Sequence, residues 1–413
     1  MKGLSLDECS AYLAIVQRLK RSCKFYDTHV HPYEVLFDRF SYGDEAADLD
    51  LLSLPGKFYT APSVAPLVFP ENMDFQDIPE SRRLQGIWIM LFRKIYGNVG
   101  ERVFADHMNL CGMDKVLMLP VPLESCNAAD FDSRMRWVKQ LYSNEDKFWI
   151  AGGIPAALRG EEIKPYAAAL KDHYGIKAMK CHQVVSGIDL GSGDRKEWLE
   201  ELFAACNELQ LPLILHGGKN NLYYGKSRSN FGSLEHLKDV DLSLCGVPLV
   251  LAHAGCHRCS TQEIVQEVLP LLIRMLKRHS NLYVDISGLG FESLKLVLQS
   301  VDGDRILFGS DALYAAQWEA VMMIMHALKE LGRKLEESFV EIASINPEKT
   351  IFRDGGSHVE VSDNQMESVF GAGAGEVAAG SVQEGSGFIG ATESDSGAGV
   401  LGFGGPETGD QSR

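Results

Sequence analysis

Residues 211–218 read LPLILHGG, an apolar run that ends on a histidine and two glycines. Residues 247–255 repeat this pattern as VPLVLAHAG, again with a histidine near the end. A run that is apolar at successive positions is typical of a strand buried on both faces of a parallel sheet. The two stretches therefore predict parallel strands that each bring one histidine to the same edge of the sheet.

Six further apolar runs accompany these two, and amphipathic stretches with helical spacing separate them. In chain order the eight runs are 24–30, 114–121, 148–155, 176–183, 211–218, 247–255, 281–288 and 305–311. Eight strand–helix units predict an α/β protein with a closed (β/α)8 TIM barrel. A doubly wound open sheet is the alternative, and the lack of a glycine-rich dinucleotide motif favours the barrel. A helix over about 5–21 is predicted before the first strand.

Two segments do not fit the strand–helix rhythm. The stretch from about 32 to 80 follows the first strand and is rich in proline, aromatic and acidic residues, so we expect a lid-like insertion at the mouth of the barrel. Residues 354–413 contain 15 glycines, and ten acidic residues against one basic residue. Such a segment buries too little apolar surface to fold. We therefore predict a barrel domain over 1–353 and a disordered tail over 354–413.

Composition excludes several classes of function. The net charge is −16, the chain has no basic stripe, and nucleic acid is therefore excluded as the main partner. Nine cysteines, an odd number, do not form a disulfide framework. The chain shows neither an apolar leader nor a run of about 18 apolar residues, so a cytoplasmic protein without a membrane partner is predicted. A small-molecule substrate remains as the expected partner, and the oligomeric state stays open, a homo-oligomer included.

Polar side chains stand at the C-terminal ends of the predicted strands. They are His29 and His31 on the first strand, Lys180 and His182 on the fourth, His216 on the fifth, His253 on the sixth and Asp311 on the eighth. Side chains at i and i+2 of a strand share one face, so the first two could bind one ion. A buried imidazole or carboxylate is costly unless it is paired or coordinated. Imidazoles with one carboxylate suit a divalent ion, Zn²⁺ first, with Mn²⁺ and Fe²⁺ as alternatives.

These strand ends resemble those of the amidohydrolase superfamily. The stretches that carry the resemblance are DTHVH (27–31), IKAMKCH (176–182), LILHGG (213–218), LVLAHAG (249–255) and ILFGSDALY (306–314). Together with INPEKTIF (345–352), they are similar to the amidohydrolase-2 branch, which contains metal-dependent hydrolases and decarboxylases. The resemblance spans about residues 24–352 and does not include the insertion or the tail.

The resemblance implies a role for each matching residue. His29, His31 and His216 would be metal ligands, and Asp311 would be a further ligand or the acceptor of a proton from a metal-activated water. His253 would orient or polarise the substrate, or bind a second ion, so that the site holds one or two ions.

The fourth strand leaves alternatives open. In some relatives a lysine at this place is carboxylated and bridges two metals, and Lys180 would then do the same. We favour instead a lysine that binds a substrate carboxylate or pairs with an acidic residue. His182 is expected to contact the substrate or to support another residue of the site.

Three functions follow from the resemblance and the residues. The first is hydrolysis of an ester, lactone or amide bond by a metal-activated water. The second is non-oxidative decarboxylation of an aromatic or unsaturated carboxylic acid at the same site. The third is a binding protein that kept the fold without catalysis, and the intact set of ligand residues argues against it.

Overall fold

The structure is a computed structural model that describes residues 3–32, 67–68, 101–220, 228–312 and 316–353. The tail predicted over 354–413 lies outside these residues. The insertion predicted over about 32–80 also lies outside them, apart from Pro32 and Leu67–Val68.

Eight strands form one sheet in which every neighbouring pair is parallel. They are β2 (Tyr26–Val30), β4 (Lys115–Met118), β5 (Phe148–Gly153), β6 (Ala178–Cys181), β7 (Leu213–Leu215), β8 (Leu249–Leu251), β9 (Leu282–Asp285) and β10 (Ile306–Leu307). Their order in the sheet is their order in the chain, and each lies within one of the eight predicted runs. The prediction of a TIM barrel is confirmed.

Hydrogen bonds between β2 and the segment that follows β10 close the barrel. The backbone N–H of Thr28 donates to the carbonyl of Phe308 at 3.0 Å. Further along, the N–H of Asp311 donates to the carbonyl of His29, and the N–H of His31 donates to the carbonyl of Ala312, both at 2.9 Å. The first and last strands therefore meet where two histidines and an aspartate had been singled out in the sequence.

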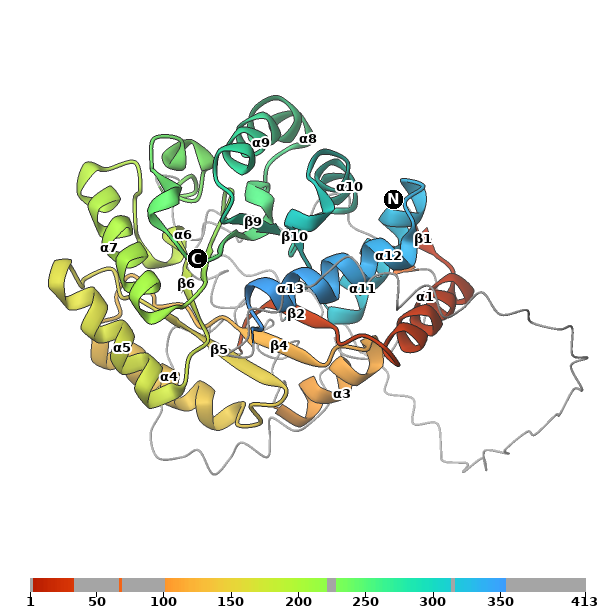
Figure 1. The fold of residues 1–413 in the computed structure, drawn as a ribbon, viewed down its shortest axis with the longest axis horizontal. Coiled ribbons are helices and arrows are strands. Elements are labelled where there is room, and N and C mark those ends of the chain that lie inside the picture. Colours follow the sequence, from red (N-terminus) through yellow and green to blue (C-terminus); the bar gives the residue numbers. More distant parts are fainter. Residues whose placement is uncertain (1–2, 33–66, 69–100, 221–227, 313–315, 354–413) are drawn as a thin grey trace, which may run out of the picture. The chain divides into compact units, whose positions relative to one another are not determined.

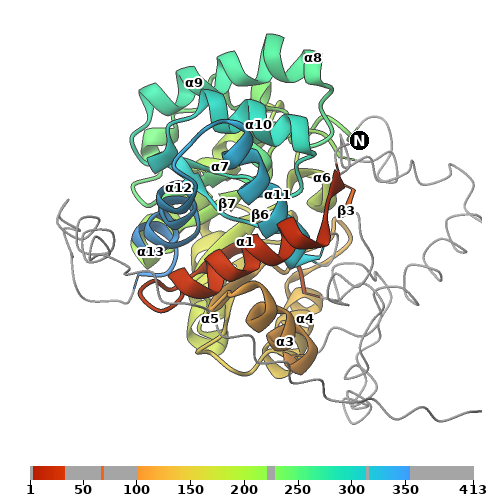
Figure 2. The same cartoon turned by 90° about the vertical axis from the view of Figure 1, so that its right-hand side faces the viewer.

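Helices lie outside the sheet (Figure 1). They are α1 (Leu6–Leu19), α3 (Glu101–Cys111), α4 (Ala128–Leu141), α5 (Ile163–Tyr174), α6 (Gln183–Ser186), α7 (Gly193–Leu209), α8 (Thr261–Glu263), α9 (Leu269–Arg278), α10 (Phe291–Ser300), α11 (Gln317–Glu330), α12 (Leu335–Val340) and α13 (Asn346–Thr350). The predicted helix over about 5–21 is α1. It begins at a capping box in which the Ser5 side chain accepts from the N–H of Glu8, and it packs against α3, α11 and α12 (Figure 2).

The interior of the barrel is filled by apolar side chains from the strands, from residues directly after them, and from the two residues that follow α13. The cluster contains Tyr26, Leu117, Leu119, Trp149, Ala151, Ala178, Ile214, Val250, Ala252, Leu307, Ile351 and Phe352. The ring of Phe352 stacks on Tyr26 with centroids 4.7 Å apart. Because Tyr26 begins β2, this packing closes the N-terminal end of the barrel, opposite the end that carries the histidines.

A second, two-stranded sheet was not expected from the sequence. Residues Gly3–Leu4 (β1) pair antiparallel with Leu67–Val68 (β3). Strands of two residues carry too few side chains to show an alternating pattern. Among the residues described, no helix has both the length and the apolar character that a membrane span needs.

Candidate metal centre

All seven residues singled out in the sequence lie at the C-terminal ends of the strands and are buried. His29 and Lys180 are on β2 and β6, and His182 is the N-cap of α6 directly after β6. His31, His216 and Asp311 follow β2, β7 and β10. His253 lies in the 3-10 turn Ala252–Gly255 after β8.

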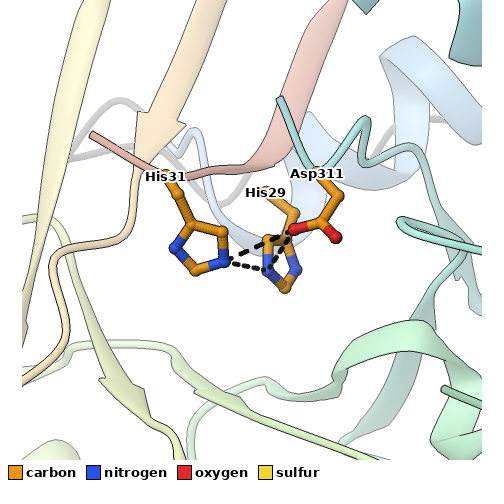
Figure 3. A group of neighbouring side chains, drawn as sticks. All are labelled: His29, His31 and Asp311. Atoms are coloured by element: carbon orange, nitrogen blue, oxygen red, sulfur yellow. Dashed lines mark hydrogen bonds and ion pairs between the residues drawn. The ribbon is translucent and has the colours of Figure 1, made fainter. Parts of the chain in front are cut away.

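Three of these residues converge on one point, as Figure 3 shows. The Nε2 atoms of His29 and His31 are 3.2 Å apart. The Oδ1 atom of Asp311 lies 3.7 Å from the first and 3.4 Å from the second. Their ligand atoms all lie within 4.8 Å of one another, and all three side chains are buried.

The hydrogen bonds on the outer side of the two rings determine which nitrogens carry hydrogen. His29 Nδ1 is 2.8 Å from Asp285 Oδ2, and His31 Nδ1 is 3.1 Å from the carbonyl oxygen of Leu119. Both partners can only accept, so each Nδ1 donates. In a neutral imidazole the Nε2 atom then holds a lone pair. Burial lowers the pKa of His29 to about 4 and that of His31 well below its ordinary value, which favours the neutral rings.

Two lone pairs 3.2 Å apart, with a carboxylate oxygen beside them, repel one another unless a cation lies between them. An ion 2.0–2.2 Å from each of three ligand atoms separates those atoms by about 3.0–3.6 Å. The separations of 3.2 and 3.4 Å fall in this range, and the third, 3.7 Å, lies 0.1 Å above it. Asp311 Oδ1 is also a buried atom without a hydrogen-bond partner among the described residues. The donor set therefore fits a divalent metal.

Asp285, at the end of β9, holds two of the histidines in place. It accepts from His29 Nδ1 at 2.8 Å and from the backbone N–H of His253 at 2.9 Å. The Ser287 hydroxyl donates to Asp285 Oδ1 at 2.5 Å. Burial raises the pKa of Asp285, but His29 and these hydrogen bonds outweigh it, and the pKa lies below its ordinary value. His29, His253 and Asp285 also lie close enough together to bind a metal. Because Asp285 already accepts hydrogen bonds from His29 Nδ1 and from the backbone N–H of His253, we assign it the role of supporting these histidines.

Asp27, two residues before His29, links β2 to the loop that carries Asp311. Its carboxylate accepts from the N–H of His29 at 3.1 Å, and from the N–H and hydroxyl of Ser310 at 3.0 and 2.6 Å. Gln317 Nε2 on α11 donates to it at 2.7 Å. Asp27 and Ser310 lie within the quoted stretches DTHVH and ILFGSDALY, but neither they nor Gln317 were assigned a role from the sequence. The serine of the GSD motif was the available signal, whereas nothing in the sequence pointed to a glutamine on the next helix.

The structure does not place His216 in the three-residue group. Its ring stacks on that of His182, with centroids 3.8 Å apart and planes inclined by 12°, and lies 5.0 Å from the ring of His253. Both ring nitrogens of His216 are buried without a hydrogen-bond partner among the described residues. A buried donor or acceptor without a partner costs about 1–3 kcal/mol, so this ring is suited to receive a bound group. Its role as a fourth ligand stays a prediction.

Lys180 brings a positive charge to the same interior. The side chain is 1% exposed, and Nζ has no hydrogen-bond partner among the described residues. Burial lowers its pKa to about 8, and the carboxylates of Asp285 and Asp311 oppose that shift. Burial raises the pKa of Asp311 to about 7, and Lys180 opposes it. The ammonium group is therefore charged at neutral pH and available to an anionic group.

Two residues of the site have a backbone conformation that non-glycine residues seldom adopt. The φ angles of His253 and Asp311 are 57° and 60°. Such a conformation costs on the order of 1–3 kcal/mol and is found where function requires a particular side-chain direction. Gly288 makes room for this arrangement, because a Cβ atom there would lie 2.6 Å from Asp311 Oδ2.

A comparison with protein families identifies the chain. The family model described as amidohydrolase matches residues 126–340. The chain belongs to the amidohydrolase family. The resemblance inferred from the strand-end motifs is thereby confirmed, and the chain is an enzyme of the amidohydrolase superfamily. A divalent metal is expected for an amidohydrolase of this family, and the His29, His31 and Asp311 group could hold one.

Solved structures of low sequence identity are similar to this amidohydrolase. One is 5-carboxyvanillate decarboxylase from Sphingomonas paucimobilis, with 14% identity, a TM-score of 0.48, and coverage of 80% of this chain and 99% of the other. Another is 2,6-dihydroxybenzoate decarboxylase from Rhizobium, with 13% identity, a TM-score of 0.47, and coverage of 81% and 100%. A third is 4-oxalomesaconate hydratase from Rhodopseudomonas palustris, with 15% identity, a TM-score of 0.46, and coverage of 80% and 96%. No curated protein sequence matches the chain.

Proposed function

We propose that this amidohydrolase is a metal-dependent hydrolase that cleaves an ester, lactone or amide bond of a small molecule. One observation carries the proposal. Asp311 Oδ1 lies 3.4 Å from His31 Nε2 and 3.7 Å from His29 Nε2, and it has no hydrogen-bond partner among the described residues. A carboxylate in this position can both hold an ion and move a proton beside it.

His29, His31 and Asp311 would hold the ion, with His216 as the fourth ligand. Imidazole and carboxylate ligands suit Zn²⁺, and also Mn²⁺ or Fe²⁺, so we propose zinc first. When bound, the ion supplies Lewis acidity and makes water acidic enough to lose a proton near neutral pH. We propose one ion for the three-residue group, and a second ion only if Lys180 is carboxylated.

The side chains around this group would divide the remaining work. Asp311 takes the proton of the attacking water on a carboxylate oxygen and returns it to the leaving oxygen or nitrogen. His253 donates its Nδ1–H to the carbonyl of Ser287 at 2.9 Å, which leaves the Nε2 lone pair for the substrate side. His182 lines the same interior against the ring of His216.

A second function shares the same site, and Lys180 supports it. A buried ammonium group that makes no hydrogen bond with the described residues favours a substrate that carries a negative charge. An aromatic or unsaturated carboxylic acid meets that requirement, and its non-oxidative decarboxylation needs no attacking water. We therefore keep a carboxy-lyase as the alternative to the hydrolase.

Isotopic labelling separates the two functions. The chain would be stripped with a chelator, reloaded with Zn²⁺ or Mn²⁺, and incubated in H₂¹⁸O with lactones, amides and aromatic carboxylic acids. Hydrolysis places one ¹⁸O atom in the product acid, whereas decarboxylation releases carbon dioxide without labelling the organic product. Turnover that survives complete removal of metal would contradict both proposals.

An Asp311→Asn variant tests the role of the carboxylate. The amide can still offer an oxygen to the ion but cannot accept the proton of water. We expect loss of turnover in a variant that has been reloaded with metal and that keeps its far-ultraviolet circular dichroism. A metal-loaded Asp311→Asn variant with undiminished turnover would rule out Asp311 as the proton acceptor.

A further inference from the structure

His257 is a buried histidine of the same interior that neither the ligand group nor the proposed chemistry uses. It follows His253 by four residues, in the loop after the turn Ala252–Gly255, and its exposed fraction is 7%. Its ring centroid lies 4.7 Å from that of His253 and 5.5 Å from that of His216. The ring therefore extends the row of imidazoles beyond the ligand group.

The backbone of Lys219, after β7, holds His257 on two sides. His257 Nδ1 is 2.8 Å from the carbonyl oxygen of Lys219, and the N–H of Lys219 donates to the carbonyl of His257, also at 2.8 Å. Gly218 permits this approach, because a Cβ atom there would lie 2.5 Å from the backbone nitrogen of His257. Its φ of 104° also favours glycine. The two hydrogen bonds to Lys219 and the close approach of Gly218 therefore hold the backbone and ring of His257 in place.

This hydrogen bond also determines the tautomer. A carbonyl oxygen only accepts, so Nδ1 of His257 carries the hydrogen, and Nε2 of the neutral ring has the lone pair. His31 and His253 show the same arrangement, with Nδ1 donating to the carbonyls of Leu119 and Ser287. Histidines whose Nε2 serves a bound group commonly have Nδ1 anchored in this way. The hydrogen bond that the His257 ring makes to Lys219 uses Nδ1, so its Nε2 is left for a group that binds at the site.

His257 is not placed to share the ion of the ligand group. Among the described residues, no group of three ligand atoms within 4.8 Å of one another includes it. Because Nδ1 donates to the carbonyl of Lys219, Nε2 is the acceptor atom of the neutral ring. The same site also contains the ammonium group of Lys180, which can pair with a negative charge. A molecule that fits both residues would carry a negative charge for Lys180 and a hydrogen-bond donor for His257.

We infer that His257 is a substrate-contacting residue whose Nε2 accepts a hydrogen bond from a hydroxyl or N–H group of the bound molecule. The inference rests on the proposed function, because it assumes that the substrate binds at the strand ends around His29 and Asp311. It narrows the substrate class to small acids that carry such a donor.

Binding of matched probes tests this inference without any turnover. Benzoate and the three monohydroxybenzoates differ by one hydroxyl donor, and all of them carry a carboxylate. Their dissociation constants would be measured by calorimetry on the metal-loaded wild type and on His257→Phe, which keeps a ring but has no acceptor. We expect one hydroxybenzoate to bind the wild type about 5–10-fold more tightly than benzoate, as one hydrogen bond allows. His257→Phe should bind both with the affinity that the wild type has for benzoate.

His257→Gln is the conservative variant, since its side-chain oxygen can accept the same hydrogen bond. It should regain part of the preference for the hydroxybenzoate, and it also serves if His257→Phe folds poorly. The preference should disappear in His257→Phe while the metal content, measured by elemental analysis, equals that of the wild type.

Several outcomes would overturn the inference. A preference of equal size in the wild type and in His257→Phe would show that the donor binds elsewhere. Equal weakening of benzoate and hydroxybenzoate would indicate a structural role, and loss of metal would indicate a ligand role. A wild type that favours no hydroxybenzoate, absence of binding included, also contradicts it. Because binding is measured, a chain that discriminates the probes but never hydrolyses any substrate would refute the proposed function alone.

Discussion

The two sides of the barrel mouth hold their side chains in different ways. On the side of β2 and β8, which we call the anchored side, the rings of His29, His31 and His253 each donate Nδ1–H to an oxygen of the protein. On the side of β6 and β7, which we call the unpaired side, Lys180 Nζ and both nitrogens of His216 have no hydrogen-bond partner among the described residues.

This difference separates two tasks. The anchored side has its lone pairs directed before anything binds, which is how a metal ligand set is prepared. The unpaired side keeps buried polar atoms unsatisfied, and each such atom costs about 1–3 kcal/mol until a bound group supplies a partner. We infer that His29 and His31 of the anchored side bind the ion first. The unpaired side then finds its partners only in what binds, with His216 as the proposed fourth ligand and Lys180 facing the substrate.

The largest effect is expected from removing a ring of the anchored side. His31→Ala should lower metal affinity and turnover by more than about 100-fold. Loss of a residue that only supports a ligand can already cost about 100-fold, and His31 is a proposed ligand itself. Metal content after dialysis, measured by elemental analysis, and turnover with the substrate found in the screen check this. His173→Ala, on the exposed face of α5, is the matched control. A His31→Ala variant with one full equivalent of metal would place the ion elsewhere.

A smaller effect is expected when a ring stays but its anchor is weakened. Asp285→Asn removes the charge that holds His29 Nδ1 and lowers metal affinity by about 10–100-fold. Competition with a chromophoric chelator measures the change, and Asp302→Asn on the surface serves as control. Unchanged affinity in Asp285→Asn would mean that the anchored side gains nothing from its anchors.

The next effect concerns the link between the strands of His29 and Asp311. Asp27→Asn turns an acceptor of Gln317 Nε2 into a donor that faces another donor, and metal affinity should fall by about 10-fold. The double variant Asp27→Asn with Gln317→Glu exchanges donor and acceptor and should recover most of the loss. If the double variant binds metal no better than Asp27→Asn, the hydrogen bond is not what positions the ligands.

The smallest effect tests the unpaired side through stability. Lys180→Met removes a buried charge without a hydrogen-bond partner and keeps a side chain of similar length, so the metal-free protein should unfold with about 1 kcal/mol more free energy. Urea denaturation followed by circular dichroism measures this. Lys334→Met, at an exposed lysine, should leave stability unchanged. A less stable Lys180→Met variant would mean that the ammonium group has a stabilising partner.

The fold and the position of the site could be predicted because both depend on local patterns. Apolar runs that end on polar residues, such as the one that ends on His216, specify parallel strands and the edge where their ends meet. Parallel topology then brings His29 and Asp311 together, although 282 positions in the chain separate them.

The hydrogen bonds that hold the site residues in place could not be predicted in the same way. The hydrogen bond from His29 to Asp285 depends on how far the barrel closes, and the anchoring of His257 depends on the positive φ of Gly218. The sequence also gave no sign that His216 would stack on His182 outside the three-residue group. Distances between strand ends follow from packing of the whole barrel, and no local pattern encodes them.

The stacking of Phe352 on Tyr26 has a consequence for engineering the chain. These two residues lie at the N-terminal end of the barrel, so a chain ended at Arg353 keeps the aromatic plug, whereas one ended at Thr350 loses it. Loss of a buried phenylalanine alone costs about 3–5 kcal/mol. A fluorescent reporter fused after Arg353 would leave the barrel on the side away from His31 and Asp311. It could therefore follow folding in cells while the mouth remains open to small molecules.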